Sequence, residues 1–162
     1  MYYYINSFYL YSFLGYIYEN LLHLIIKGKF LKNVLYEPIK PIYGIGVIII
    51  IIIERFIFNR IKVSKRLKIF LVFITTIVVL TALEGISGVI LEKLVHKVLW
   101  NYSDMKFNFG KYICLEVSFV WGIMSIVFLY VLKSFFDKVL KKIPVWFSNI
   151  MLIITITDIL LS

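Results

Sequence analysis

Three glutamates and two histidines stand within or beside stretches that are otherwise apolar enough to enter a membrane. Glu19 precedes His23 by four residues, and Glu92 precedes His96 by the same spacing. Residues four apart share one face of an α-helix, so each pair would present a carboxyl group beside an imidazole. Glu84 lies three such steps before His96 and adds a third carboxyl group. Groups of this kind can bind a polar ligand or exchange protons.

The spacing does not match the common metal sites. Helical bundles that bind two iron ions use Glu-x-x-His, whereas this chain has Glu-x-x-x-His, and the H-E-x-x-H pattern of zinc proteases is absent. The single cysteine, Cys114, and only two histidines exclude a cysteine-rich zinc site. We therefore predict no metal and no cofactor, and the sequence names no catalytic residue.

Composition places these residues in a membrane protein. Hydrophobic residues make up 62% of the 162 positions, and the mean hydropathy is +0.94, well beyond the values of soluble domains. An α-helix needs about 20 apolar residues to cross a bilayer. We predict an all-α, polytopic helical bundle with about five transmembrane helices, which forms one integral membrane domain over residues 1–162 of a multi-pass cell-membrane protein. The five apolar segments cover residues 3–26, 42–59, 69–92, 113–133 and 144–161.

The excess of 18 Lys and Arg over 9 Asp and Glu fits this location. The basic residues stand in short connections between apolar segments, where they meet lipid headgroups, so a nucleic-acid partner is not expected. Two signals for orientation disagree. The count of basic residues favours a cytoplasmic N terminus, whereas the first helix, basic only on its trailing side, favours the opposite.

Five spans would put the first and third connections on the same membrane face. Glu19 and Glu84 would then lie at one depth, about 12 Å below the helix ends at 1.5 Å per residue. A charge in lipid is costly unless it is paired or hydrated, so we expect both to face a polar cavity. Two interpretations stay open for Glu92 and His96, which are part of that site or a solvated helix end.

Prolines, glycines and aromatic residues shape the same face. Pro41 suits the first turn of the second apolar helix, and Gly44 allows close backbone approach. This segment is a tight turn or the re-entrant lip of a cavity. Trp100 is an expected interface anchor, and Ser118 with Gly122 would let helices pack closely.

Several separated motifs resemble one known family. In order along the chain they read "GYIYEN", "KPIYGIG", "LEGISGVILEKLVHKVLWNYSD", "FNFGKYICLEVS" and "WG" at residues 121–122. Together they cover about residues 8–135 and are similar to the bacterial family called putative ABC-transporter type IV, the CmpB-like putative ABC transporter permeases. Asn101 stands where that family has an aspartate.

The resemblance, together with the positions of the ionisable groups, gives two sets of candidate site residues; His23 and Asp104 enter the first set from their positions alone. The polar cavity would be lined by Glu19, His23, Glu84, Glu92, His96, Tyr102, Ser103, Asp104 and Asn108. The structural residues would be Pro41, Tyr43, Gly44, Trp100, Gly110, Trp121 and Gly122.

The sequence leaves three classes of function open. The resemblance favours a permease-like component that binds a separate ATPase subunit, because the chain has no G-x-x-x-x-G-K-[ST] phosphate loop. Five helices make a small pathway, so a homo-oligomer or larger complex is expected. The alternatives are a membrane-embedded enzyme that acts on a lipid-linked substrate and a non-catalytic partner subunit.

Overall fold

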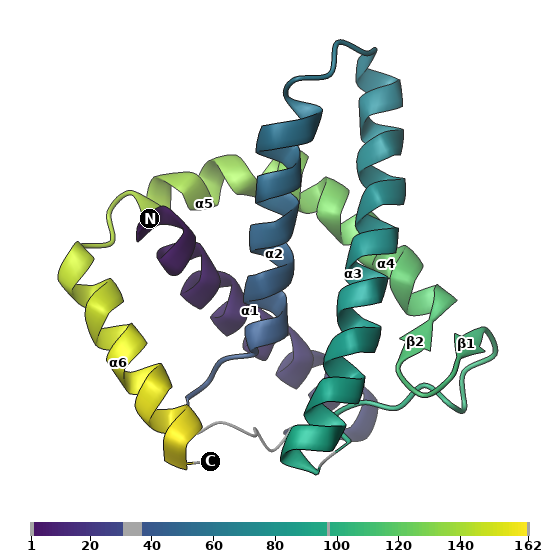
Figure 1. The fold of residues 1–162 in the computed structure, drawn as a ribbon, viewed down its shortest axis with the longest axis vertical. Coiled ribbons are helices and arrows are strands. Elements are labelled where there is room, and N and C mark those ends of the chain that lie inside the picture. Colours follow the sequence, from purple (N-terminus) through teal and green to yellow (C-terminus); the bar gives the residue numbers. More distant parts are fainter. Residues whose placement is uncertain (1, 31–36, 97, 162) are drawn as a thin grey trace. The chain divides into compact units, whose positions relative to one another are not determined.

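Helices make up most of the chain in the computed structural model, which describes residues 2–30, 37–96 and 98–161 (Figure 1). Each of the five predicted apolar segments is helical, so the prediction of an all-α fold is confirmed in its main part. A two-stranded hairpin is the exception, and its second strand, Ile113–Cys114, takes the first two residues of the fourth segment. The elements are α1 (Tyr2–Lys27), α2 (Pro41–Ile53), the π-helical turn η1 (Glu54–Phe58), α3 (Lys65–Val95), β1 (Asn108–Phe109), β2 (Ile113–Cys114), α4 (Leu115–Val127), the π-helical turn η2 (Phe128–Leu132), α5 (Lys133–Leu140) and α6 (Val145–Leu161).

Three continuous helices of the described chain are long and apolar enough to cross a membrane. They are Pro41–Phe58, Lys65–Leu94 and Leu115–Leu140. Helix α6 is apolar but shorter. Helix α1 is long enough at 26 residues, but it contains seven tyrosines, whose hydroxyl groups lower its hydropathy. The predicted number of about five transmembrane helices therefore stays a prediction.

The boundaries of α2 and α3 follow from local chemistry. Pro41 begins α2, where its fixed φ is favourable and its missing N–H costs nothing. Ser64 caps α3 by accepting a hydrogen bond from the Leu67 N–H at 3.3 Å. Helix α3 ends at Val95, and the next residue, His96, adopts the left-handed conformation with φ of 54° that commonly terminates a helix.

The chain divides into two compact units, and the first comprises residues 1–49 and 135–162. Within it, α1 packs on α6, where the Ser148 hydroxyl donates a hydrogen bond to Asn6 Oδ1. Helix α1 also meets the start of α2, since a Cβ atom at Gly44 would overlap Ser12. The prediction of one domain over the whole chain is not tested by this division and stays a prediction.

The second unit comprises residues 50–134, and α3 and α4 form its core. The Thr81 hydroxyl donates to Ser118 Oγ at 2.7 Å, and the Phe73 and Phe119 rings meet edge to face with centroids 5.2 Å apart. Gly122 lies against Phe73, where a Cβ atom would overlap the ring. The hairpin of β1 and β2 lies beside the C-terminal half of α3 (Figure 1).

One predicted connection is helical. Residues 133–144 were expected to link two spans, but the helix continues through α5 to Leu140. This segment is amphipathic: Leu140 is buried, whereas Lys138 and Lys141 are exposed. The Phe136 ring packs edge to face against Tyr11, with centroids 5.6 Å apart. Burial of one apolar face explains why a segment rich in lysine forms a helix.

Candidate functional site

The side chain of Glu84 lies buried on α3 and accepts two hydrogen bonds. The Tyr102 hydroxyl donates to Oε1 at 2.7 Å, and the indole Nε1–H of Trp121 donates to Oε2 at 3.3 Å. Tyr102 belongs to the connection between α3 and α4, and Trp121 belongs to α4. Because a buried carboxyl group is costly without partners, this pair of donors explains how an apolar helix accommodates it.

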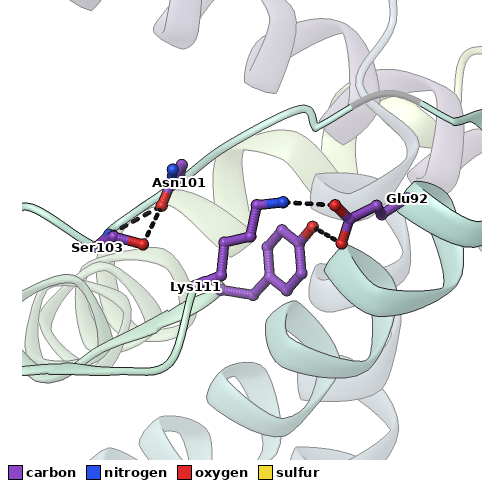
Figure 2. A network of polar contacts seen from close by, with 5 residues as sticks. Glu92, Asn101, Ser103 and Lys111 are labelled. Carbon is purple, nitrogen blue, oxygen red and sulfur yellow. Dashed lines mark hydrogen bonds and ion pairs between the residues drawn. The ribbon is translucent and has the colours of Figure 1, made fainter.

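Glu92 lies just over two helical turns further along α3 and binds the same connection. The Lys111 ammonium group lies 2.5 Å from Glu92 Oε1, and the Tyr112 hydroxyl donates to Oε2. Figure 2 shows Lys111 reaching from the connection to Glu92 at the helix. The hydrogen bond to the Glu92 carboxylate raises the pKa of Lys111 above its usual value. Lys111 therefore stays charged over the physiological pH range.

The connection folds back on itself through short-range polar contacts. Asn101 Oδ1 accepts hydrogen bonds from the backbone N–H of Ser103 at 2.9 Å and from its hydroxyl at 2.7 Å (Figure 2). The Asn108 side chain donates to the carbonyls of Ser103 and Gly110, both at 3.2 Å. Gly110 has φ of 68°, a conformation that favours glycine. These contacts stabilise the hairpin that presents Lys111 to α3.

Small residues on α3 make room for this connection. A Cβ atom at Gly88 would overlap the Tyr112 ring, and one at Gly85 would overlap the Ile113 side chain. The buried Tyr112 ring also meets Trp100 edge to face, with centroids 6.1 Å apart. We call residues 98–114 the clasp, because they contact α3 at the level of both Glu84 and Glu92.

The structure brings several predicted site residues into the second unit but gives them different surroundings. Glu84 is buried and Glu92 is half-buried, whereas His96, Asp104 and Asn108 are exposed. His96 follows the last residue of α3. The hydrogen-bond partners of Glu92 are Lys111 and Tyr112, which belong to the clasp. Ser103 is also exposed, and its contacts lie within the clasp.

The remaining candidates, Glu19 and His23, belong to the first unit. Glu19 Oε2 lies 2.9 Å from the Lys40 ammonium group, and both side chains are partly buried. His23 Nδ1 lies 2.7 Å from the carbonyl oxygen of Lys29. Lys40 precedes the start of α2, so its ion pair joins that point to α1. The prediction that Glu19 and Glu84 share a cavity stays a prediction.

The residues predicted to be structural have identifiable contacts. Tyr43 packs where Gly15 of α1 leaves space, and its ring meets Tyr18 edge to face at 6.2 Å. Trp121 is one of the two donors to Glu84. Trp100 contributes a ring contact to the clasp. These positions therefore hold helices and the clasp in place.

Sequence reasoning missed a buried polar cluster in the first unit. The Thr155 hydroxyl donates to Glu37 Oε2 at 2.6 Å, and the backbone N–H of Glu37 donates to Asp158 Oδ2 at 2.7 Å. All three side chains are buried. The i,i+3 spacing of Thr155 and Asp158 placed both on one face of α6, but nothing in the sequence pointed from that face to Glu37.

The described residues contain no group of three or more His, Cys, Asp or Glu side chains arranged to hold a metal ion. What they do contain is a set of carboxyl groups, each held by hydroxyl, indole or ammonium donors. Such an arrangement orders helices and a connection, and it can also respond to a polar ligand that competes for the same donors.

The long apolar helices and the acids set within them define a helical membrane protein. The family described as Putative ABC-transporter type IV matches residues 6–162, and the chain belongs to that family. The family resemblance predicted from the motifs is thereby confirmed. Comparison with curated proteins gave no match, and neither did comparison with solved structures.

Proposed function

We propose that the protein is a permease-like membrane component of an ABC-type transporter. The observation that carries this proposal is membership of the family over residues 6–162. Three helices apolar enough to cross a membrane support it, because a permease must provide a path through the bilayer. The protein would act in the cell membrane of a bacterium as a multi-pass protein.

The proposal requires an ATPase on another chain. The sequence has no G-x-x-x-x-G-K-[ST] segment, the loop that cradles nucleotide phosphates in such motors. Few helices are available to enclose a pathway, so two copies or additional subunits would complete it. The functional complex would then lie in the lipid bilayer and contain an ATPase subunit and more than one membrane subunit.

Within this proposal, the acids of the helices line a polar cavity. Glu84 supports the idea most directly, because its carboxyl group is buried on an apolar helix and depends on Tyr102 and Trp121. A ligand that offered donors of its own could exchange with either of them. The clasp would then open or close with occupancy, since Tyr102 belongs to it.

The test is purification of tagged protein from its native membrane in mild detergent, followed by mass spectrometry of what remains bound. The expected result is a stoichiometric ATPase subunit whose ATP hydrolysis increases when the membrane protein is present. The Glu84→Gln variant should keep the ATPase bound but lose the increase in ATP hydrolysis, because it changes a buried side chain and leaves the protein surface unchanged.

Two other results would overturn the proposal. Absence of an ATPase, together with a retained lipid-linked intermediate that accumulates in the Glu84→Gln variant, would indicate a membrane-embedded enzyme instead. Absence of both, with no effect of Glu84→Gln on cells, would indicate a non-catalytic partner subunit. A matched Glu116→Gln variant, which changes a half-buried acid in the first turn of α4, controls for general loss of charge.

A further inference from the structure

The turn that joins the second and third apolar helices is strongly basic. Residues 55–68, here named the basic turn, contain six Lys or Arg residues and no acid. Glu54 immediately precedes them and lies 3.8 Å from the Lys133 ammonium group, so its charge is already compensated. The basic turn therefore carries a concentrated positive charge. Its cations are Arg55, Arg60, Lys62, Lys65, Arg66 and Lys68.

Most of this charge is available to a partner. Arg60, Lys62, Lys65 and Arg66 are exposed. The side chains of Lys62, Lys65 and Arg66 form no hydrogen bond or ion pair with any other residue that the structure describes. Lys65 and Arg66 also begin α3, whose N-terminal end adds a positive partial charge. The exposed cations thus point to an anionic partner.

The backbone beneath these cations is held in place. Lys68 donates to Asn59 Oδ1 at 3.0 Å, and Asn59 donates to Glu54 Oε1 at 3.3 Å. Ser64 caps α3 through the Leu67 N–H. A short connection with a fixed conformation loses little entropy when it binds.

Apolar side chains are interleaved with the cations. Phe56 is 51% exposed, and the guanidinium carbons of Arg55 and Arg60 lie 5.9 and 5.6 Å from the centroid of its ring. Ile61 and Leu67 are exposed as well. Binding to an acidic protein surface would not require these exposed apolar side chains, whereas a membrane interface accommodates them beneath the level of the lipid phosphates.

We propose that the basic turn binds the phosphate groups of anionic phospholipids in the leaflet that it meets. Both ends of the turn continue into helices apolar enough to span the bilayer, which places its cations at headgroup level. Cation clusters next to a transmembrane helix attract anionic lipids, and each exposed cation strengthens binding by about fivefold. This lipid site is independent of the transport function proposed above.

The test uses the full-length protein in nanodiscs of phosphatidylcholine with a minor fraction of phosphatidylglycerol. Electron paramagnetic resonance of spin-labelled lipids measures how strongly the protein retains phosphatidylglycerol relative to phosphatidylcholine. The variant K62Q/K65Q/R66Q should lower this selectivity by about fivefold or more, and added salt should weaken the wild-type selectivity. The charge-conserving variant K62R/K65R/R66K should retain it.

The matched control is K138Q/K141Q/K142Q, which removes the same charge from three exposed residues at the end of α5. Equal loss of selectivity in this control would overturn the proposal, because the effect would then follow net charge and not the basic turn. Unchanged lipid selectivity in K62Q/K65Q/R66Q would also overturn it. If that variant instead lost a copurifying acidic subunit, the basic turn would be a protein docking surface.

Discussion

The Tyr102 hydroxyl lies 2.7 Å from Glu84 Oε1, although the two residues are 18 positions apart and one of them is buried in α3. This contact joins the clasp to a buried side chain of an apolar helix. Glu92 makes the second such contact, with Lys111 and Tyr112. Two acids on one helix therefore determine where the connection to α4 lies.

Removal of the Tyr102 hydroxyl should destabilise the second unit. In Tyr102→Phe, Glu84 keeps Trp121 as a donor but loses the shorter hydrogen bond, which costs about 1–2 kcal/mol for a buried acceptor. Thermal unfolding in detergent measures the loss. Tyr130→Phe is the matched control, since that ring is 43% exposed, and it should change the midpoint little. Equal shifts in both variants would contradict the structural role of Tyr102.

A methyl group at Gly88 should displace the clasp. Gly88→Ala introduces a Cβ atom where the Tyr112 ring packs, so we expect a lower unfolding midpoint and faster proteolysis of residues 98–114. Ser87→Ala, one position earlier on α3, is the control. In a Tyr112→Ala background, Gly88→Ala should cost much less, because the ring is gone. Additive effects of the two substitutions would exclude the proposed contact.

The ion pair of Lys111 and Glu92 gives the clasp a defined dependence on pH. The folded pKa of Lys111 is raised, so the stabilisation is fully present below its unfolded value and is lost as the pH rises through the folded value. We expect labelling of Cys114, the buried thiol at the end of the clasp, to accelerate as the pH rises into the alkaline range. Lys111→Gln should label rapidly at neutral pH as well. A transition near pH 7 in the wild type would argue against this pair as its cause.

The buried cluster of the first unit should depend on Thr155. Thr155→Val keeps the shape of the side chain but removes the donor to Glu37, at an expected cost of about 1–3 kcal/mol. Thr157→Val is a close control on the same helix, because Thr157 is exposed and bonds only its own helix at the Ile153 carbonyl. Similar midpoints for the two variants would show that the Glu37 contact contributes nothing to stability.

Cysteine labelling from each side of the membrane can count the spans. In a Cys114→Ala background, single cysteines at residues 2 and 141 should react from one side, and cysteines at residues 30 and 161 from the other. This pattern requires α1 and α6 to cross the membrane in addition to the three longer helices. If residues 2 and 30 react from the same side, α1 does not span and the prediction of five spans fails.

The helical segments were predictable because lipid allows few alternatives. A backbone in a bilayer must satisfy its hydrogen bonds within the segment, so each apolar run had to be helical even where isoleucine favours strands, as in α2. The acids at positions 84 and 92 were also recognisable, because ionisable groups on such helices stand out. Their partners were not, since Lys111 and Tyr112 are separated from Glu92 by a connection with no periodic pattern.

Hydropathy and the order of the motifs were enough to assign a helical membrane protein to one family and its acids to particular helices. Hydrophobic runs and local spacing carry that information, because they act within a few turns of one helix. The contacts of Tyr102 and Trp121 with Glu84, and of Thr155 with Glu37, could be seen in the folded chain alone. Those contacts depend on how a connection folds and how helices pack, and residues distant in sequence carry no local signal of either.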